Sequence, residues 1–138
     1  MDKIKALFTT IFGGLASLLG ALAIPIFLLV ACNIIDYGTG IVASKYRNQT
    51  IDSYKGIKGI AKKVCMWLLV VVGAIIDALI RYASESAGIA IPFEFAIACV
   101  VAIWLVCNEL ISILENIGDI GVPLPAFLGK LVKNIKSQ

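Results

Sequence analysis

Residues 93–125 read FEFAIACVVAIWLVCNELISILENIGDIGVPLP, and the first 22 of them, residues 93–114, are almost entirely apolar. Their polar or charged members are Glu94, Asn108, Glu109 and Ser112. At a rise of about 1.5 Å per residue, a helix of this length measures about 33 Å, enough to cross a hydrocarbon core of about 30 Å. The stretch therefore predicts a membrane helix that carries a carboxylate deep inside it, followed by a polar exit at residues 115–125.

The composition of the whole chain supports this interpretation. The 138 residues are 60% apolar and 15% charged, against about 45–50% and about 25% in soluble domains. A soluble chain of this length could not bury so much apolar surface. Three apolar blocks, at residues 6–35, 64–80 and 93–114, are long enough to matter. We predict a single-domain, all-α integral membrane protein with three transmembrane helices and the lipid bilayer as its main partner.

The positive charges are unevenly placed along the chain. Six lie between the first and second apolar blocks, namely Lys45, Arg47, Lys55, Lys58, Lys62 and Lys63. Three more lie in the tail, namely Lys130, Lys133 and Lys136, and Arg81 is the one between the second and third blocks. Because cytoplasmic loops collect Lys and Arg, we expect residues 45–63 and the C-terminus inside and residues 83–90 outside. Topology and attraction to anionic lipid account for these charges, so we expect no nucleic-acid partner.

The cysteines indicate neither disulfides nor a metal site. They lie within or at the edge of apolar blocks, without C-x-x-C spacing, and are Cys32, Cys65, Cys99 and Cys107. They are typical of small buried hydrophobes. The chain has no His, and nothing supplies a nucleophile with a base or a phosphate-binding loop. We therefore predict no metal, no cofactor and no enzymatic activity.

The N-terminal residues 1–22 predict an amphipathic or membrane-packed helix. Bulky residues recur at helical spacing, opposite a face of small ones such as Thr9, Gly13 and Ser17. A cleaved signal peptide fits loosely, but the apolar run continues without a break. If residues 4–22 lie at the interface or pack on another helix, the chain has three spans and the N-terminus outside. If they cross independently, it has four spans and the N-terminus inside. We predict three.

The first two spans each carry an acidic residue. In the span at residues 24–42, Asp36 lies toward the cytoplasmic end, and Gly40 allows close approach of another backbone. A solvated charge or a pair with a lysine of the 43–63 loop is the alternative to a functional role for Asp36. In the span at residues 64–82, Asp77 and Arg81 are four residues apart and are expected to pair near the outer surface.

The third span, residues 93–114, carries polar groups along one side, including Glu94, Glu109, Ser112 and Asn116, with Asn108 and Glu115 flanking it. An intramembrane carboxylate should face protein or water and is a functional-site hypothesis by default. The alternative is that Asn108 and Glu109 hydrogen-bond between helices. The candidate oligomerisation or pore-lining residues are Asp36, Gly40, Asp77, Glu94, Asn108, Glu109, Ser112, Glu115 and Asn116.

The tail, residues 122–136, predicts a short amphipathic helix. Its apolar residues Phe127, Leu128, Leu131 and Ile135 can lie on the membrane. Its lysines would then face water and anionic headgroups.

Several short motifs resemble one family. Residues 36–40, DYGTG, resemble the D-x-x-T-G element of phage holins, in the group that includes the toxin-secretion/phage-lysis holins of clostridia and relatives. The resemblance covers residues 24–130, and the N-terminal helix carries none of it. It continues through Ser53, Gly56-Ile57, Gly59-Ile60 and Lys62-Lys63, and it is strongest at Asn108-Glu109, Ser112-Ile113, Glu115-Asn116, Gly121 and Pro123-Leu124-Pro125.

The resemblance implies a small phage-encoded protein of the host cytoplasmic membrane, with three spans, the N-terminus out and the C-terminus in. Such holins assemble with copies of themselves into lesions that release an endolysin or a toxin as cargo, without necessarily binding it. Two other functions remain open from the residues alone. One is a small oligomeric ion or proton channel with Glu109 as its ion site. The other is a structural membrane subunit that anchors a soluble partner through the basic loop.

Overall fold

The computed structural model describes residues 2–137, which form helices and connecting turns with no strand among them. The elements are α1 (Asp2–Leu19), the short 3-10 turn η1 (Gly20–Leu22), α2 (Ala23–Tyr46), α3 (Ser53–Ser86), α4 (Ala96–Ile120) and α5 (Ala126–Lys136). Within this described part, three stretches are long and apolar enough to cross a membrane, namely Asp2–Tyr46, Ser53–Ser86 and Ala96–Ile120. The predicted all-helical membrane fold with three spanning helices is confirmed.

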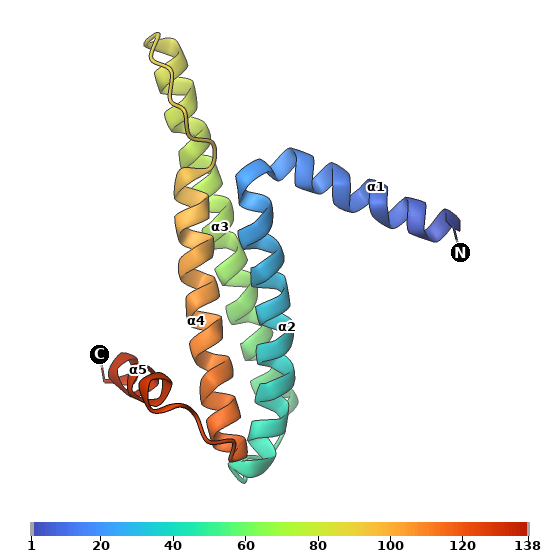
Figure 1. The fold of residues 1–138 in the computed structure, drawn as a ribbon, viewed down its shortest axis with the longest axis vertical. Coiled ribbons are helices and arrows are strands. Elements are labelled where there is room, and N and C mark those ends of the chain that lie inside the picture. Colours follow the sequence, from blue (N-terminus) through green and yellow to red (C-terminus); the bar gives the residue numbers. More distant parts are fainter. Residues whose placement is uncertain (1, 138) are drawn as a thin grey trace.

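Helices α2, α3 and α4 run alongside one another as a bundle (Figure 1), and α4 is the helix that contacts both of the others. It packs along both neighbours, whereas α2 and α3 contact each other far less. Small residues let the backbones approach: a side-chain carbon built on Gly73 of α3 would lie 3.0 Å from the Cα of Ala98 on α4. The buried apolar core consists of Leu22, Leu29, Val70, Ala98, Ala102 and Leu105.

Helix α1 leaves the bundle at a sharp corner and runs across its axis (Figure 1). Gly20 makes the corner, with a φ of +52° that side chains rarely tolerate. None of the residues of α1 is buried, and its closest aromatic link to α2 is the Phe12–Phe27 pair, with ring centroids 5.8 Å apart. This placement agrees with the predicted amphipathic or membrane-packed helix, and not with a fourth span inside the bundle.

Helices α2 and α3 extend into the stretch predicted as a loop, residues 43–63. Helix α2 continues to Tyr46 and α3 begins at Ser53, so the residues between them are 47–52 only. Asp52 starts α3 as its N-cap by accepting a hydrogen bond from the Tyr54 amide at 3.2 Å. We call this turn, with the adjoining C-terminus of α4, the basic end of the bundle, and the turn at residues 87–95 the hairpin end.

Helix α4 is shifted toward the C-terminus relative to the prediction of residues 93–114. It begins at Ala96 because Phe95, its N-cap, adopts a left-handed φ of 55°, and it ends at Gly121, whose φ is +101°. Helix α5 begins after Pro125, four residues later than residue 122. It leaves the bundle at the basic end (Figure 1).

Candidate functional site

A buried ionic cluster joins the three helices of the bundle through one lysine. The Lys63 ammonium, on α3, donates to Asp36 Oδ2 of α2 at 2.8 Å and to Glu109 Oε2 of α4 at 2.5 Å. Glu109 is only 4% exposed, and the side chains of Lys63 and Asp36 are 20% and 15% exposed. Because α2 and α3 pack on each other so little, this ammonium is a principal link between them.

Two uncharged side chains complete the cluster on its side toward the hairpin end. The Asn33 amide, in the orientation that satisfies both neighbours, donates to Glu109 Oε2 at 2.9 Å and accepts from the Trp67 indole N–H at 3.0 Å. Asn33 belongs to α2 and Trp67 to α3. Both neighbours of α4 therefore contribute a polar partner to Glu109, Asn33 from α2 and Lys63 from α3.

A second set of hydrogen bonds continues from Asp36 to the basic end. The Asn116 amide, on α4, donates to Asp36 Oδ1 and to Thr39 Oγ1, both at 3.1 Å. Its oxygen accepts from the Arg47 guanidinium at 3.0 Å, and Arg47 also pairs with Asp119. Within residues 2–137, no buried side-chain oxygen or nitrogen lacks a hydrogen-bond partner. The cluster is therefore internally satisfied in a single chain, as buried polar groups generally are.

One ammonium serves two carboxylates in this cluster. Burying a charge is expensive unless it is paired and hydrogen-bonded, and removing one partner of a buried pair costs about 3–5 kcal/mol. Lys63 therefore compensates two acids at once. The compensation of both buried carboxylates therefore depends on a single side chain.

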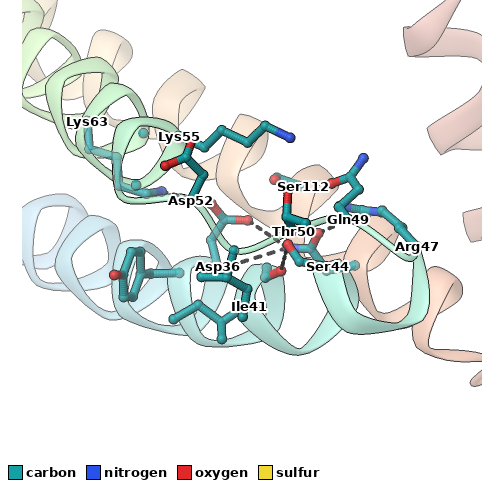
Figure 2. A pocket seen from close by; sticks show the side chains of 16 residues that line it. Asp36, Ile41, Ser44, Arg47, Gln49, Thr50, Asp52, Lys55, Lys63 and Ser112 are labelled. Carbon is teal, nitrogen blue, oxygen red and sulfur yellow. Dashed lines mark hydrogen bonds and ion pairs between the residues drawn. The ribbon is translucent and has the colours of Figure 1, made fainter.

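A polar cavity of about 320 Å³ opens beside the cluster toward the basic end. Figure 2 shows Asp36, Arg47, Lys55, Lys63 and Ser112 among the side chains that line it. Its lining includes Gly40, Gly56 and Gly59, which leave room for the cavity because glycine has no side chain. The volume is enough for several water molecules at about 30 Å³ each, so one side of the ionic cluster can be hydrated. Within the described residues, no group of three His, Cys, Asp or Glu side chains could hold a metal ion.

The hairpin end has its own polar contacts, and they correct one prediction. The expected Asp77–Arg81 pair is wrong: the Asp77 carboxylate accepts from the backbone amides of Ile97 at 2.9 Å and Ala98 at 2.8 Å. It caps the first turn of α4, whose amides have no partner within their own helix. Arg81 instead pairs with Glu94 and, at 3.9 Å, with Glu85.

The family comparison agrees with this membrane architecture. The chain matches the model of the bacteriophage holin family over residues 9–137. It belongs to the bacteriophage holin family. Membership supports a holin-type membrane function for this multi-pass membrane protein and agrees with the motif resemblance.

Three relatives illustrate how far the similarity to this holin-family chain extends. An uncharacterized protein of Halalkalibacterium halodurans is 33% identical over 88% of this chain and 84% of its own length. An uncharacterized protein of Listeria monocytogenes is 34% identical over 91% of this chain and 79% of its own. An uncharacterized 14.9 kDa protein of Clostridium perfringens is 29% identical over 99% of this chain and 89% of its own. No solved structure matches the chain.

In this holin-family chain, three of the predicted polar residues come together in the ionic cluster and its extension: Asp36, Glu109 and Asn116. Gly40 adjoins Asn116, whose amide nitrogen would lie 3.6 Å from a side-chain carbon built there. Asp36 pairs with a lysine, Lys63, and Glu109 hydrogen-bonds to Lys63 and Asn33 on the neighbouring helices. These contacts are the alternatives to a functional role that the sequence left open for the two acids. Lining of a pore in an assembly stays a prediction for both.

The remaining candidates lie apart from the cluster. Ser112 lines the cavity, whereas Asp77 and Glu94 belong to the hairpin end. Asn108 and Glu115 are half-buried on α4. A role of these residues in oligomerisation stays a prediction.

Most of the lysines and arginines predicted to lie at the membrane surface are exposed, and their contact with a membrane stays a prediction. Lys63 is not at the surface but inside the ionic cluster, because its long side chain reaches between the helices. The exposed members are Lys45, Arg47, Lys55, Lys58, Lys62, Lys130 and Lys133, and the side chain of Lys136 lies outside the described part.

Three residues of the site were missed in the sequence: Asn33, Thr39 and Trp67. Spacing could have found them, because Asn33 and Thr39 lie three residues either side of Asp36, and Trp67 lies four after Lys63.

Proposed function

We propose that this chain is a holin that oligomerises in the cytoplasmic membrane of its bacterial host and opens holes through which an endolysin, or a toxin, leaves the cell. The observation that carries the proposal is the holin-family match over residues 9–137. That match covers Ser53–Ser86 and Ala96–Ile120 in full and the stretch Asp2–Tyr46 from residue 9 onward.

The surface of a single chain supports self-association. Helix α3 has 34 residues, yet only Val70, Gly73 and Ser84 are buried. Its remaining surface faces lipid or other protein. Because lipid is as apolar as the helices, association depends on close packing and on polar contacts that average about 0.6 kcal/mol each. Contacts this weak give a dispersed population at low density and a cooperative array at high density.

The charge distribution supports one orientation. The basic end carries Arg47 and Lys45, and the first turns of α3 add Lys55, Lys58 and Lys62. Positive charge favours the cytoplasmic side, so we place the basic end and α5 in the cytoplasm and α1 at the outer surface. Helix α5 then rests on the anionic inner leaflet.

Inducible expression in a bacterium tests the proposal. Four cultures would express the chain, an endolysin without its own export signal, both, or neither, while turbidity and released endolysin activity are followed. We expect abrupt lysis after a delay only when both are present, and growth arrest without lysis when the chain is expressed alone. Continued growth with the endolysin retained inside, despite accumulation of the chain in the membrane, would refute the proposal.

The cavity lined by Asp36 and Lys63 favours a second candidate, a small ion or proton channel. The Asp36 carboxylate lies on the cavity wall, and Lys63 links it to the buried Glu109. A carboxylate that water can reach from one side can serve as an ion site. Planar-bilayer recordings separate the two. A single reproducible unit conductance with ion selectivity supports the channel, and passage of a folded protein supports the holin.

A further inference from the structure

Two polar side chains of α4, Asn108 and Ser112, make no hydrogen bond among residues 2–137, and Ser112 lines the cavity at the basic end. Asn108 lies at the midpoint of Ala96–Ile120 and is half-buried, yet its amide makes no hydrogen bond with any residue from 2 to 137. Glu109 and Asn116 differ from it, since both bond to other helices. Glu109 and Asn116 are therefore used within the chain, whereas the Asn108 amide bonds to none of the described residues.

Trp104 repeats the pattern one turn earlier. Its ring is 57% exposed, and its indole N–H likewise finds no acceptor among the described residues, whereas the indole of Trp67 donates to Asn33. Positions four apart lie on one helix face, and Ile111 continues this face three residues after Asn108. This stripe of Trp104, Asn108 and Ile111 is separate from the core face of α4, which carries Ala98, Ala102, Leu105 and Glu109.

We propose that this stripe is the surface on which a second copy of the chain docks, with Asn108 hydrogen-bonding across the contact. The proposal rests on the proposed function, because it assigns the self-contact of the assembling protein. Acyl chains offer neither donors nor acceptors, so an amide at the middle of a span is costly until another polypeptide meets it.

The chemistry of the amide selects a second copy as the partner. All copies insert in the same direction, so Asn108 lies at one depth in every copy. An amide carries both donors and an acceptor, and two amides at equal depth can therefore bond reciprocally across a symmetric contact. The indole N–H of Trp104, which only donates, would then bond to the Asn108 carbonyl oxygen of the other copy.

Cross-linking tests the position of the contact. In a variant whose four native cysteines are replaced by alanine, Ile111→Cys places a thiol on the stripe, and Leu110→Cys places one at the same depth on the opposite flank. We expect oxidation in membranes to give disulfide-linked dimers of the first variant and not of the second. Equal cross-linking of the two would overturn the assignment.

Energy transfer between labelled chains in vesicles tests the amide itself. Asn108→Leu should raise the dissociation constant of self-association about threefold to tenfold, and Trp104→Phe about threefold. Asn108→Gln, which keeps an amide, should retain most of the wild-type affinity. Leu110→Ala, on the opposite flank, should change nothing. Thermal unfolding followed by circular dichroism verifies that each variant folds; wild-type association of a folded Asn108→Leu variant would overturn the proposal.

Dye release from the same vesicles separates this inference from the proposed function. If the wild-type chain associates through the stripe while the vesicles stay sealed, the proposed function fails and the docking surface stands. If the vesicles leak and Asn108→Leu associates like the wild type, the docking surface is wrong and the proposed function stands.

Discussion

Replacing Lys63 by methionine would remove the one ammonium that two buried carboxylates share. Methionine fills a similar length of apolar stem, so the change deletes charge and hydrogen bonds with little loss of packing. It leaves Asp36 and Glu109, which Lys63 contacts at 2.8 Å and 2.5 Å, without a cation. The link between α2 and α3 is then reduced to Asn33 and Trp67.

The expected loss follows from burial. Breaking a buried pair costs about 3–5 kcal/mol in the free energy of unfolding, and Lys63 serves two acids whose side chains are 15% and 6% exposed. We therefore expect a loss of about 4–5 kcal/mol for Lys63→Met. Neutralising the acids as well, with Asp36→Asn and Glu109→Gln, should recover at least half of it, because no uncompensated charge remains.

Unfolding in mixed micelles with a rising fraction of SDS, followed by circular dichroism, measures these differences. Lys62→Met is the matched control: Lys62 is the preceding residue, is exposed, and should change stability by no more than about 0.5 kcal/mol. Equal stability of the Lys63→Met and Lys62→Met variants would show that the Lys63 ammonium does not stabilise the two buried carboxylates. So would a triple variant that is less stable than Lys63→Met alone.

Three further predictions address other parts of the fold. Gly73→Ala should lower the free energy of SDS unfolding by about 1–3 kcal/mol, because the new carbon meets the α4 backbone at 3.0 Å. In the control Gly59→Ala, the new carbon meets nothing within 4 Å, so the change should be neutral or stabilising by up to about 1 kcal/mol. Equal effects of the two variants would contradict the packing of α3 on α4. Asp77→Ala should lower the free energy of unfolding by about 2 kcal/mol, because the amides of Ile97 and Ala98 lose their acceptor. The first turn of α4 should then fray and exchange its amide hydrogens faster; unchanged exchange would argue against the cap. An impermeant maleimide on intact cells should label Ser86→Cys and spare Ser53→Cys, and the reverse pattern would invert the proposed topology.

Hydrophobic periodicity and length were sufficient to predict the helices that cross the membrane. The block at residues 93–114 and the amphipathic tail both became helices close to the expected positions. The first turns of α3 were missed although Tyr54, Ile57 and Ile60 recur at helical spacing, because the lysines and glycines between them favoured a loop. The start of α4 was missed because the left-handed backbone of Phe95 is a local choice that hydropathy does not encode.

The polar site was predicted in part. Glu109, Asp36 and Asn116 stand out because each is costly inside an apolar span. The partner of the two acids was misplaced, since Lys63 lies at the edge of an apolar block, where a lysine usually reaches the surface. Its inward direction depends on two carboxylates contributed by other helices, at separations of 27 and 46 residues. No local pattern carries that information.

Release of two markers of different size from vesicles tests whether the chain opens holes large enough for a folded protein. Purified chain would be reconstituted at increasing protein-to-lipid ratios into vesicles that contain a small dye and a folded fluorescent protein. We expect retention of both at low density and, above a threshold ratio, release of the folded protein together with the dye. Vesicles that stay sealed at every density, or that lose the dye while retaining the protein, would contradict this expectation.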